Sequence, residues 1–179
     1  MAVRLANEGD AAAIAAIYRP YVEGSRISFE ETPPDAVEIA RRMRSPFHPW
    51  LVVEDDGRVA GYASTSPMRA REAYRWSVET GIYIATEMQG RGLGTTLLAA
   101  HLELLERQGF VTIIAGIALP NDASVALHER FGFTLSGIER GVGHKLGQWV
   151  DVGRWQRDLA ARTDMPVAPL TSAELQALA

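Results

Sequence analysis

The chain has 179 residues, of which 47% are hydrophobic and 22% charged, proportions typical of one globular α/β domain with a sizeable core. Its formal net charge is −4, whereas proteins that bind nucleic acid are usually basic, so we expect no nucleic-acid partner. The sequence contains no cysteine, which excludes disulfides, thiolate metal sites and a cysteine nucleophile.

The first half of the chain predicts a strand, two amphipathic helices and a hairpin. Apolar residues recur at intervals of three and four after Asp10 and again after Asp35, and each aspartate is a good helix cap. Prolines within residues 28–34 and 45–49 end the helical patterns. Asp-Gly at residues 56–57 lies between two apolar runs, a strong hairpin signal. We expect strands at residues 3–6, 51–54 and 58–63.

The second half alternates strands and helices. Residues 78–85 are β-branched and aromatic, which favours a strand, and the leucines from Leu97 to Leu105 have helical spacing. A buried strand over 111–119, a helix over 124–130 and strands over 133–138 and 148–159 follow, with a glycine-rich span at 141–147. The helix between strands 78–85 and 111–119 requires these strands to be parallel, so the sheet is mixed.

No uncharged apolar run approaches the roughly 18 residues that cross a membrane. The apolar run at residues 11–18 follows Glu8 and Asp10, whereas a secretory signal begins with basic residues. We therefore expect no membrane partner and a cytoplasmic protein.

A glycine loop joins the strand at 78–85 to the following helix. Alternating glycines in Gln89-Gly90-Arg91-Gly92-Leu93-Gly94 precede the helix, whose first N–H groups and dipole favour a phosphate. A P-loop would need a lysine, and a dinucleotide fingerprint would need the third glycine one position later. A purely structural turn is the remaining alternative. The loop does match the Q/R-x-x-G-x-G/A loop of the GNAT superfamily of N-acetyltransferases, which binds the pyrophosphate of coenzyme A.

Two later segments strengthen this resemblance. Asn121-Asp122-Ala123-Ser124-Val125-Ala126-Leu127-His128-Glu129-Arg130-Phe131-Gly132-Phe133 resembles the N-x-x-[SA]-x-x-L-[YH]-E-x-x-G-F signature of the superfamily. Residues 143–156 resemble the K-x-G-x-W-x-D-V-x-x-W/M-Q segment of the phosphinothricin and methionine sulfoximine acetyltransferases, and residues 76–84 resemble the stretch around their catalytic glutamate.

The resemblance covers residues 3–158 and implies the acyl-CoA N-acyltransferase fold. That α/β fold has a mixed central sheet, helices on both faces and a bulged, splayed strand pair at the cofactor site. The resemblance also implies acetyl-CoA as co-substrate, a small amino acid or analogue as acceptor, and a homodimer. We expect an acetyltransferase domain over residues 1–159 and a C-terminal surface tail over 160–179. Without cysteine, direct transfer in a ternary complex is the simplest route.

The resemblance assigns two catalytic residues. Glu79 is the expected general base, which accepts the proton that the amine must lose; the structural alternative is a solvated carboxylate at a strand edge. His128 stands where many relatives have tyrosine. It is expected either to share the role of base or to protonate the leaving thiolate, with a core histidine as the structural alternative.

The binding residues follow from the same motifs. The cofactor set is Ile82, Tyr83, Ile84, Gln89, Gly90, Arg91, Gly92, Leu93, Gly94, Thr95 and Asn121. Backbone N–H groups at 82–84 are expected to stabilise the oxyanion, while Asn121 contacts the cofactor, caps a helix, or does both. By resemblance the acceptor set is Phe29, Arg69, Arg71 and Tyr74, because an arginine fork suits a carboxylate or phosphinate. A solvated basic loop is the alternative for the arginines.

Several assignments stay open. The acceptor could be another amine, such as a protein N-terminus, or the chain could be a non-catalytic module that binds CoA or a nucleotide. Lys145, Trp149 and Asp151 could shape the pocket or a dimer contact. The four histidines lack the spacing of metal ligands, so we expect no metal, and His101 lies on the leucine face of its helix, as a structural residue would.

Overall fold

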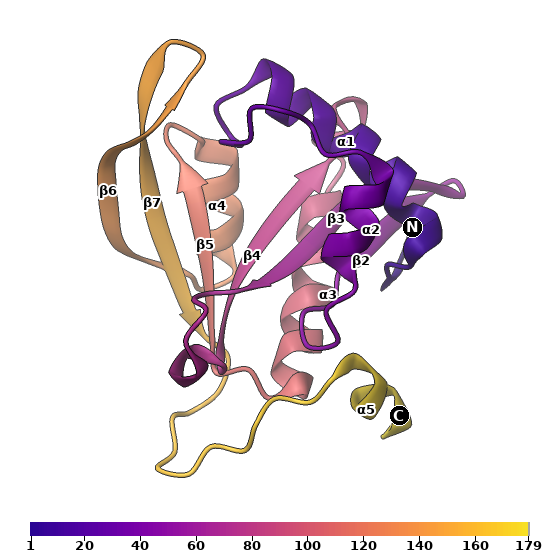
Figure 1. Cartoon of the computed structure of the whole chain (residues 1–179), viewed down its shortest axis with the longest axis vertical. Helices are drawn as coiled ribbons and strands as arrows, with labels where there is room; N and C mark the ends of the chain where they lie inside the picture. Colours follow the sequence, from indigo (N-terminus) through magenta and orange to yellow (C-terminus); the bar gives the residue numbers. More distant parts are fainter. Residues whose placement is uncertain (179) are drawn as a thin grey trace.

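The computed structural model describes residues 1–178 and contains a seven-stranded sheet between two layers of helices (Figure 1). Its strands are β1 (Ala2–Leu5), β2 (Leu51–Asp55), β3 (Arg58–Pro67), β4 (Ser77–Ile84), β5 (Thr112–Ala118), β6 (Thr134–Lys145) and β7 (Gln148–Asp158). Their spatial order is β1-β2-β3-β4-β5-β7-β6, and β4–β5 is the parallel pair in an otherwise antiparallel ladder. The predicted mixed sheet is confirmed.

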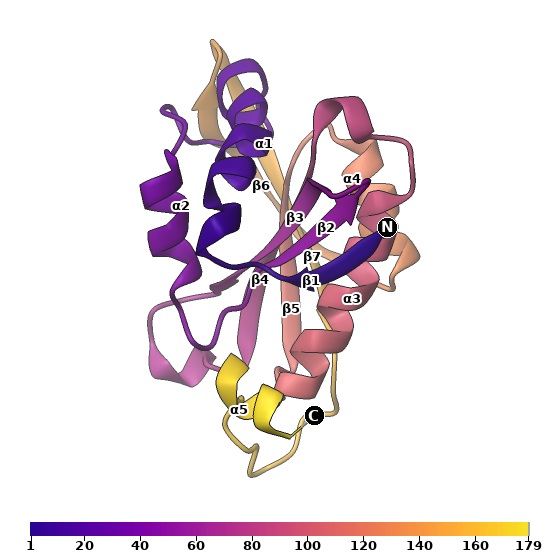
Figure 2. The same ribbon diagram turned by 90° about the vertical axis from the view of Figure 1, so that its right-hand side faces the viewer.

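Helices cover both faces of the sheet. Helices α1 (Ala11–Gly24) and α2 (Ala36–Met43) lie on one face, and α3 (Leu93–Gln108) and α4 (Asp122–Arg130) lie on the other (Figure 2). Side chains alternate along each strand, so Val52 and Tyr62 pack with α1 whereas Leu51 and Ala63 pack with α3. Within residues 1–178, none of the helices is both long enough and apolar enough to cross a bilayer.

Strands β4 and β5 separate halfway along their length. They pair from Ser77 with Thr112 to Thr80 with Ala115. Beyond that point β4 continues beside β3, and β5 continues beside β7. Figure 1 shows the gap between the two arrowheads. The facing edges of residues 81–84 and 116–118 therefore lie outside the ladder and border an opening through the sheet.

The late hairpin differs from the sequence prediction. The glycine-rich span at 141–147 was predicted to separate two strands, but β6 extends to Lys145 and the turn is confined to Leu146 and Gly147, with φ of 49° and 75°. Register shifts between Leu135 and Gly137 and between Glu139 and Gly143 absorb the glycines. Hydrogen bonds to β7 therefore outweigh the low strand propensity of glycine, a tertiary effect that local sequence does not show.

The predicted tail lies against the C-terminal end of α3. The backbone N–H of Leu170 donates to the carbonyl of Gln108 at 2.7 Å, and Trp76 Nε1 donates to the carbonyl of Val167 at 2.8 Å. Helix α5 (Ser172–Ala177) begins with a capping box at Thr171 and buries Leu175. The division into a domain of residues 1–159 and a tail stays a prediction.

His101 is a fully buried residue of α3. Its Nε2 lies 2.7 Å from Thr65 Oγ1 and its Nδ1 lies 3.2 Å from Thr80 Oγ1, so both ring nitrogens are hydrogen-bonded. Desolvation lowers its pKa from 6.5 to about 3. The imidazole is therefore neutral at pH 7 and ties α3 to β3 and β4.

The buried His101 predicts an acid-labile fold. Below pH 6.5 the unfolded chain binds a proton at this position that the folded protein binds only near pH 3, so the stability due to neutral His101 is lost as pH falls through this window. His101→Gln should reduce the pH slope of the unfolding free energy by about 1.4 kcal/mol per pH unit between pH 6 and 4. Urea unfolding measures this pH slope. Leu98→Ala, a cavity variant on the same helix, should keep the wild-type slope, and an unchanged slope in His101→Gln would contradict the prediction.

Candidate active site

A cleft of about 560 Å³ occupies the opening between β4 and β5. We call it the β4–β5 cleft. The start of α3 and one side of α4 complete its walls. Ten of the predicted cofactor residues line it: Ile82, Tyr83, Ile84, Gln89, Gly90, Gly92, Leu93, Gly94, Thr95 and Asn121. Tertiary structure thus brings the glycine loop, the splayed strand and the Asn121 segment to one surface.

The glycine loop has the backbone geometry of an anion cradle. Gly90 and Gly92 have φ of 73° and 79°, in the left-handed region that other residues avoid. A Cβ added at either position would meet no atom within 4 Å among the described residues, so the backbone is open to a ligand. Gly92 is also the N-cap of α3 and has no side chain to bond the first N–H groups. These donors and the helix dipole favour a phosphate at this point.

Arg91 is the one predicted cofactor residue that points elsewhere. Its Nη2 lies 2.7 Å from Asp55 Oδ2, at the hairpin between β2 and β3, and its Nη1 lies 3.0 Å from Met88 Sδ. The side chain of Asp55 is largely buried, with 12% exposed. This ion pair holds the glycine loop against the sheet, so in this conformation the Arg91 guanidinium stabilises the loop and does not line the β4–β5 cleft.

Asn121 and His128 lie at opposite ends of α4. Asn121 Oδ1 accepts from the Ser124 N–H at 3.2 Å, which makes it the helix cap, and the residue also lines the cleft. His128 lines the same cleft and is 3% exposed. Its Nδ1 donates to the carbonyl of Ser124 at 2.8 Å, so in the neutral ring Nε2 carries the lone pair. Nε2 is buried without a hydrogen-bond partner among residues 1–178, and desolvation lowers the pKa of His128 below 6.5.

Glu79 faces two further cavities on the α1 side of the sheet. One, of about 680 Å³, is lined by Phe29, Glu79, Glu139 and Arg154 among others, and we call it the Glu79 cavity. The other, of about 770 Å³, has an aromatic wall that includes Trp50, Tyr62 and Tyr83. The Glu79 cavity shares Thr80, Tyr83 and Gly116 with the β4–β5 cleft. The two spaces therefore meet where β4 and β5 diverge.

The carboxylate of Glu79 is held by arginines. Its Oε1 lies 3.0 Å from Arg154 Nη1 and 3.7 Å from Arg69 Nη1, and 29% of its side chain is exposed. Arg154 also contacts Glu139 Oε2 through Nε at 3.2 Å. The alternative of a solvated carboxylate at a strand edge therefore does not fully describe Glu79, because its side chain is only partly exposed and is ion-paired.

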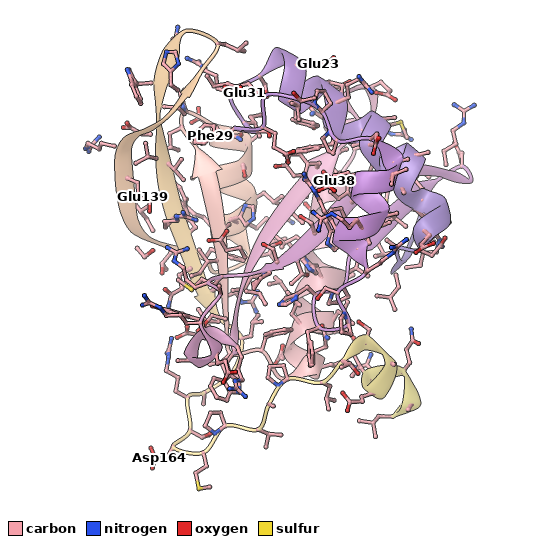
Figure 3. The ribbon with its side chains drawn as sticks, in the orientation of Figure 1. Glu23, Phe29, Glu31, Glu38, Glu139 and Asp164 are labelled. Carbon is pink, nitrogen blue, oxygen red and sulfur yellow. The ribbon has the colours of Figure 1, made fainter. Side chains whose placement is uncertain are left out.

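Two of the four predicted acceptor residues lie near Glu79, and the other two lie outside the cavities. Phe29 lines the Glu79 cavity, and Figure 3 shows it beside the β6–β7 hairpin that carries Glu139. Arg69 reaches Glu79 from the connection between β3 and β4. Arg71 and Tyr74 lie at the short helical turn Glu72–Tyr74 of the same connection, outside the three cavities described above, and Tyr74 is 40% exposed.

Glu30 organises the loop that carries Phe29. Its carboxylate receives two bonds from Arg42 of α2 at 2.7 and 2.9 Å and one from the Tyr18 hydroxyl at 3.0 Å. The Arg42 guanidinium lowers the pKa of Glu30, so the carboxylate stays charged. Lys145 Nζ donates to the backbone carbonyl of Glu30. Lys145, whose role the sequence left open, therefore supports this loop from β6.

Arg154 is the site residue that sequence reasoning missed. In the structure Trp155 is 4% exposed and packs with α3, so its neighbours on β7 face the opposite side, where Glu79 lies. Arg154 is also opposite Gly116 in the β5–β7 register. Strand alternation in the sequence indicates that Arg154 and Trp155 face opposite sides, but not which carboxylate Arg154 meets.

Comparison with known proteins gives consistent results. Residues 3–153 match the family model described as an acetyltransferase (GNAT) domain. A phosphinothricin N-acetyltransferase of Streptomyces viridochromogenes is 42% identical over 173 residues, with 94% of each chain covered. An L-methionine sulfoximine/L-methionine sulfone acetyltransferase of Pseudomonas aeruginosa is 36% identical over 92% of this chain and 98% of its own. The crystal structure of a GNAT superfamily phosphinothricin acetyltransferase from Sinorhizobium meliloti, in complex with acetyl-CoA, superposes with a TM-score of 0.89 and 36% identity over 94% of both chains.

Proposed function

The chain belongs to the GNAT acetyltransferase family, and on that premise we propose that it transfers the acetyl group of acetyl-CoA to the α-amino group of a small amino acid or analogue. The acceptors we propose are of the phosphinothricin, methionine sulfoximine or methionine sulfone type, after the names of its relatives. The observation that carries the proposal is the position of Glu79, whose carboxylate faces a cavity that opens onto the β4–β5 cleft.

The β4–β5 cleft has the features that acetyl-CoA requires. The open N–H groups at Gly90, Gly92 and the start of α3 would hold the pyrophosphate. The unpaired edge of residues 82–84 would hold the extended arm and supply donors to the oxyanion. Asn121 would add a contact from α4. When bound, acetyl-CoA supplies the acetyl group as a thioester. Arg91 is proposed to act indirectly, through its ion pair with Asp55.

Glu79 is proposed as the general base. The acceptor amine is mostly protonated at neutral pH and must lose a proton before its nitrogen forms the amide bond. Glu79 lines the Glu79 cavity and is the chain neighbour of Thr80, which borders both spaces, so it can take this proton directly or through one water. In direct transfer within a ternary complex the amine nitrogen bonds to the acetyl carbon, the carbon–sulfur bond of the thioester breaks, and CoA leaves as a thiolate that takes a proton from solvent. This route needs no covalent enzyme intermediate, in keeping with a chain that has no cysteine.

His128 is proposed to act from the cofactor side. It lines the β4–β5 cleft and not the Glu79 cavity, so the two residues approach the junction from opposite sides. Its lowered pKa leaves the ring neutral at pH 7, and its N–H is already bonded to Ser124. Of the two roles that the sequence left open, proton acceptance at Nε2 is therefore the better supported.

The acceptor assay is the direct test. Purified protein is mixed with acetyl-CoA and phosphinothricin, methionine sulfoximine or methionine sulfone, and a thiol reagent reports free CoA. We expect CoA release that depends on the acceptor, together with an N-acetylated product by mass spectrometry. Tight binding of acetyl-CoA without turnover of any of the three would contradict the proposed acceptor class. Turnover of peptide N-termini instead would support the alternative amine.

Phe29 is proposed to close the acceptor site, and Gly143 gives a way to test it. A Cβ built at Gly143 would overlap the Phe29 ring, with Cδ2 only 2.7 Å away. Because Phe29 is 40% exposed, its ring can move away, so Gly143→Ala should displace it from the Glu79 cavity. We expect the KM of the acceptor to rise about tenfold, as for loss of one aromatic contact, with the KM of acetyl-CoA unchanged. Phe29→Ala should reproduce the effect. A normal KM of the acceptor in both variants would contradict the proposal that Phe29 closes the acceptor site.

We also propose a homodimer. The β6–β7 hairpin exposes large apolar side chains, among them Ile138, Val142, Leu146 and Trp149, the last being 72% exposed. Such a patch supports burial against a second copy. The sequence left two roles open for Trp149, one in the pocket and one in a dimer contact. We propose that it belongs to the dimer contact. Light scattering should give twice the chain mass, and Trp149→Glu should yield monomers. A monomeric wild-type protein would contradict the proposal.

A further inference from the structure

Arg154 is placed between the proposed base and a second carboxylate. It projects from β7, with Nη1 3.0 Å from Glu79 Oε1 and Nε 3.2 Å from Glu139 Oε2. Its side chain is 29% exposed, so the guanidinium is partly withdrawn from water. Ion pairs in such surroundings are screened less than surface pairs. The ion pair between Arg154 and Glu79 is therefore a significant electrostatic interaction of the site before an acceptor binds.

Gly116 leaves room for this guanidinium. It lies opposite Arg154 on the neighbouring strand, and a Cβ built there would be 3.0 Å from Arg154 Nη1. Gly116 also lines both the β4–β5 cleft and the Glu79 cavity. The guanidinium thus lies at the junction itself, where the amine of an acceptor has to approach Glu79.

This arrangement imposes a charge requirement on the acceptor. Glu79 already has a cationic partner, so an ammonium group that approaches it must compete with Arg154. An acceptor with only an amine would displace the guanidinium from Glu79 and leave it with Glu139 as its one carboxylate partner in a partly desolvated site. An α-amino acid carries a carboxylate next to its ammonium group. It can exchange partners with the resting pair, so that two ion pairs replace one.

We propose that Arg154 is a specificity-determining residue that binds the α-carboxylate of the acceptor while the ammonium group of the acceptor takes its place on Glu79. This inference rests on the proposed function and refines it. Glu139 holds the guanidinium at the site during the exchange, because its contact is through Nε and leaves Nη1 for the acceptor. Arg69 is 3.7 Å from Glu79 and is bonded to the Met68 carbonyl, so we assign this role to Arg154 and not to Arg69.

The test compares matched acceptors on matched variants. Methionine sulfone and phosphinothricin are each assayed beside the α-carboxamide of the same compound, in wild type, Arg154→Met and Arg162→Met. Arg162 is the control, since it pairs with Asp158 at 2.6 Å, outside the three cavities. The measured quantity is the ratio of kcat/KM for the acid to kcat/KM for the amide. Any general effect of a variant on Glu79 cancels in this ratio, because both acceptors use the same base.

We expect wild type and Arg162→Met to prefer the acid, and Arg154→Met to lose this preference by roughly 30-fold, as for one charge-assisted hydrogen bond. Most of the loss should appear in the KM of the acid. Thermal unfolding and acetyl-CoA affinity confirm that each variant is folded. An unchanged ratio in Arg154→Met, with wild type active, would overturn this inference alone. A wild-type protein that binds acetyl-CoA and acetylates none of these compounds would overturn the proposed function and the inference with it.

Discussion

Replacing Glu79 with glutamine is expected to lower kcat for the acceptor by about 10³-fold, the size of a lost general base. Glutamine keeps the shape of the side chain but cannot accept the proton that the acceptor amine has to lose. The side chain faces the Glu79 cavity and not the phosphate end of the β4–β5 cleft, so the affinity for acetyl-CoA should equal that of wild type. Stopped-flow or steady-state CoA release gives kcat, and calorimetry gives the affinity.

The control for this experiment is Glu23→Gln. Glu23 forms an exposed ion pair with Arg19 on α1, so Glu23→Gln also removes an ion pair between glutamate and arginine, but Glu23 lies away from the cavities. Its kcat should equal that of wild type. Raising the pH offers a further check, because more of the free amine is then unprotonated and the deficit of Glu79→Gln should shrink. A variant with wild-type kcat at pH 7 would show that the base lies elsewhere.

Replacing His128 with phenylalanine is expected to lower kcat by about 10²-fold, at the lower end of the range for acid–base groups. Phenylalanine preserves the packing against Phe133, whose ring lies 5.0 Å from the His128 ring, but removes Nε2. The wild-type pH profile tests the same assignment. The pKa of His128 is lowered, so its neutral form already dominates at pH 6.5, and kcat should decline only below that pH.

The direction of the pH effect separates the two roles of His128. A proton acceptor is active when neutral, so activity falls as the ring becomes protonated. A proton donor to the thiolate would show the opposite trend, with activity rising as pH falls toward the pKa. His128→Phe should lack the acid limb. A variant with full activity, or a wild-type rate that increases in acid, would contradict the proposed role at Nε2.

Much of this protein could be predicted from local sequence. Periodic apolar residues, capping aspartates and the Asp-Gly turn fix the order of strands and helices, because these signals act over a few residues. The crossover helix between β4 and β5 also requires their parallel pairing. The glycine loop could be identified as a phosphate site since its chemistry lies in its own backbone.

Contacts between distant segments could not be predicted in this way. The β6 strand runs through glycines because β7 supplies its hydrogen bonds, and Arg91 turns to Asp55 because the hairpin lies beside the loop. Neither effect is encoded within a short window of sequence. The same holds for Arg154, which has a place in the site only because β7 lies next to β5.

The sequence by itself therefore determined the elements, the phosphate loop and the family resemblance of the chain. Tertiary structure decided where the charges meet. Glu79 is 75 residues from Arg154 in sequence, yet their side chains form an ion pair at the opening between β4 and β5. Such pairing depends on strand order and on the room left by Gly116, and both are properties of the assembled sheet.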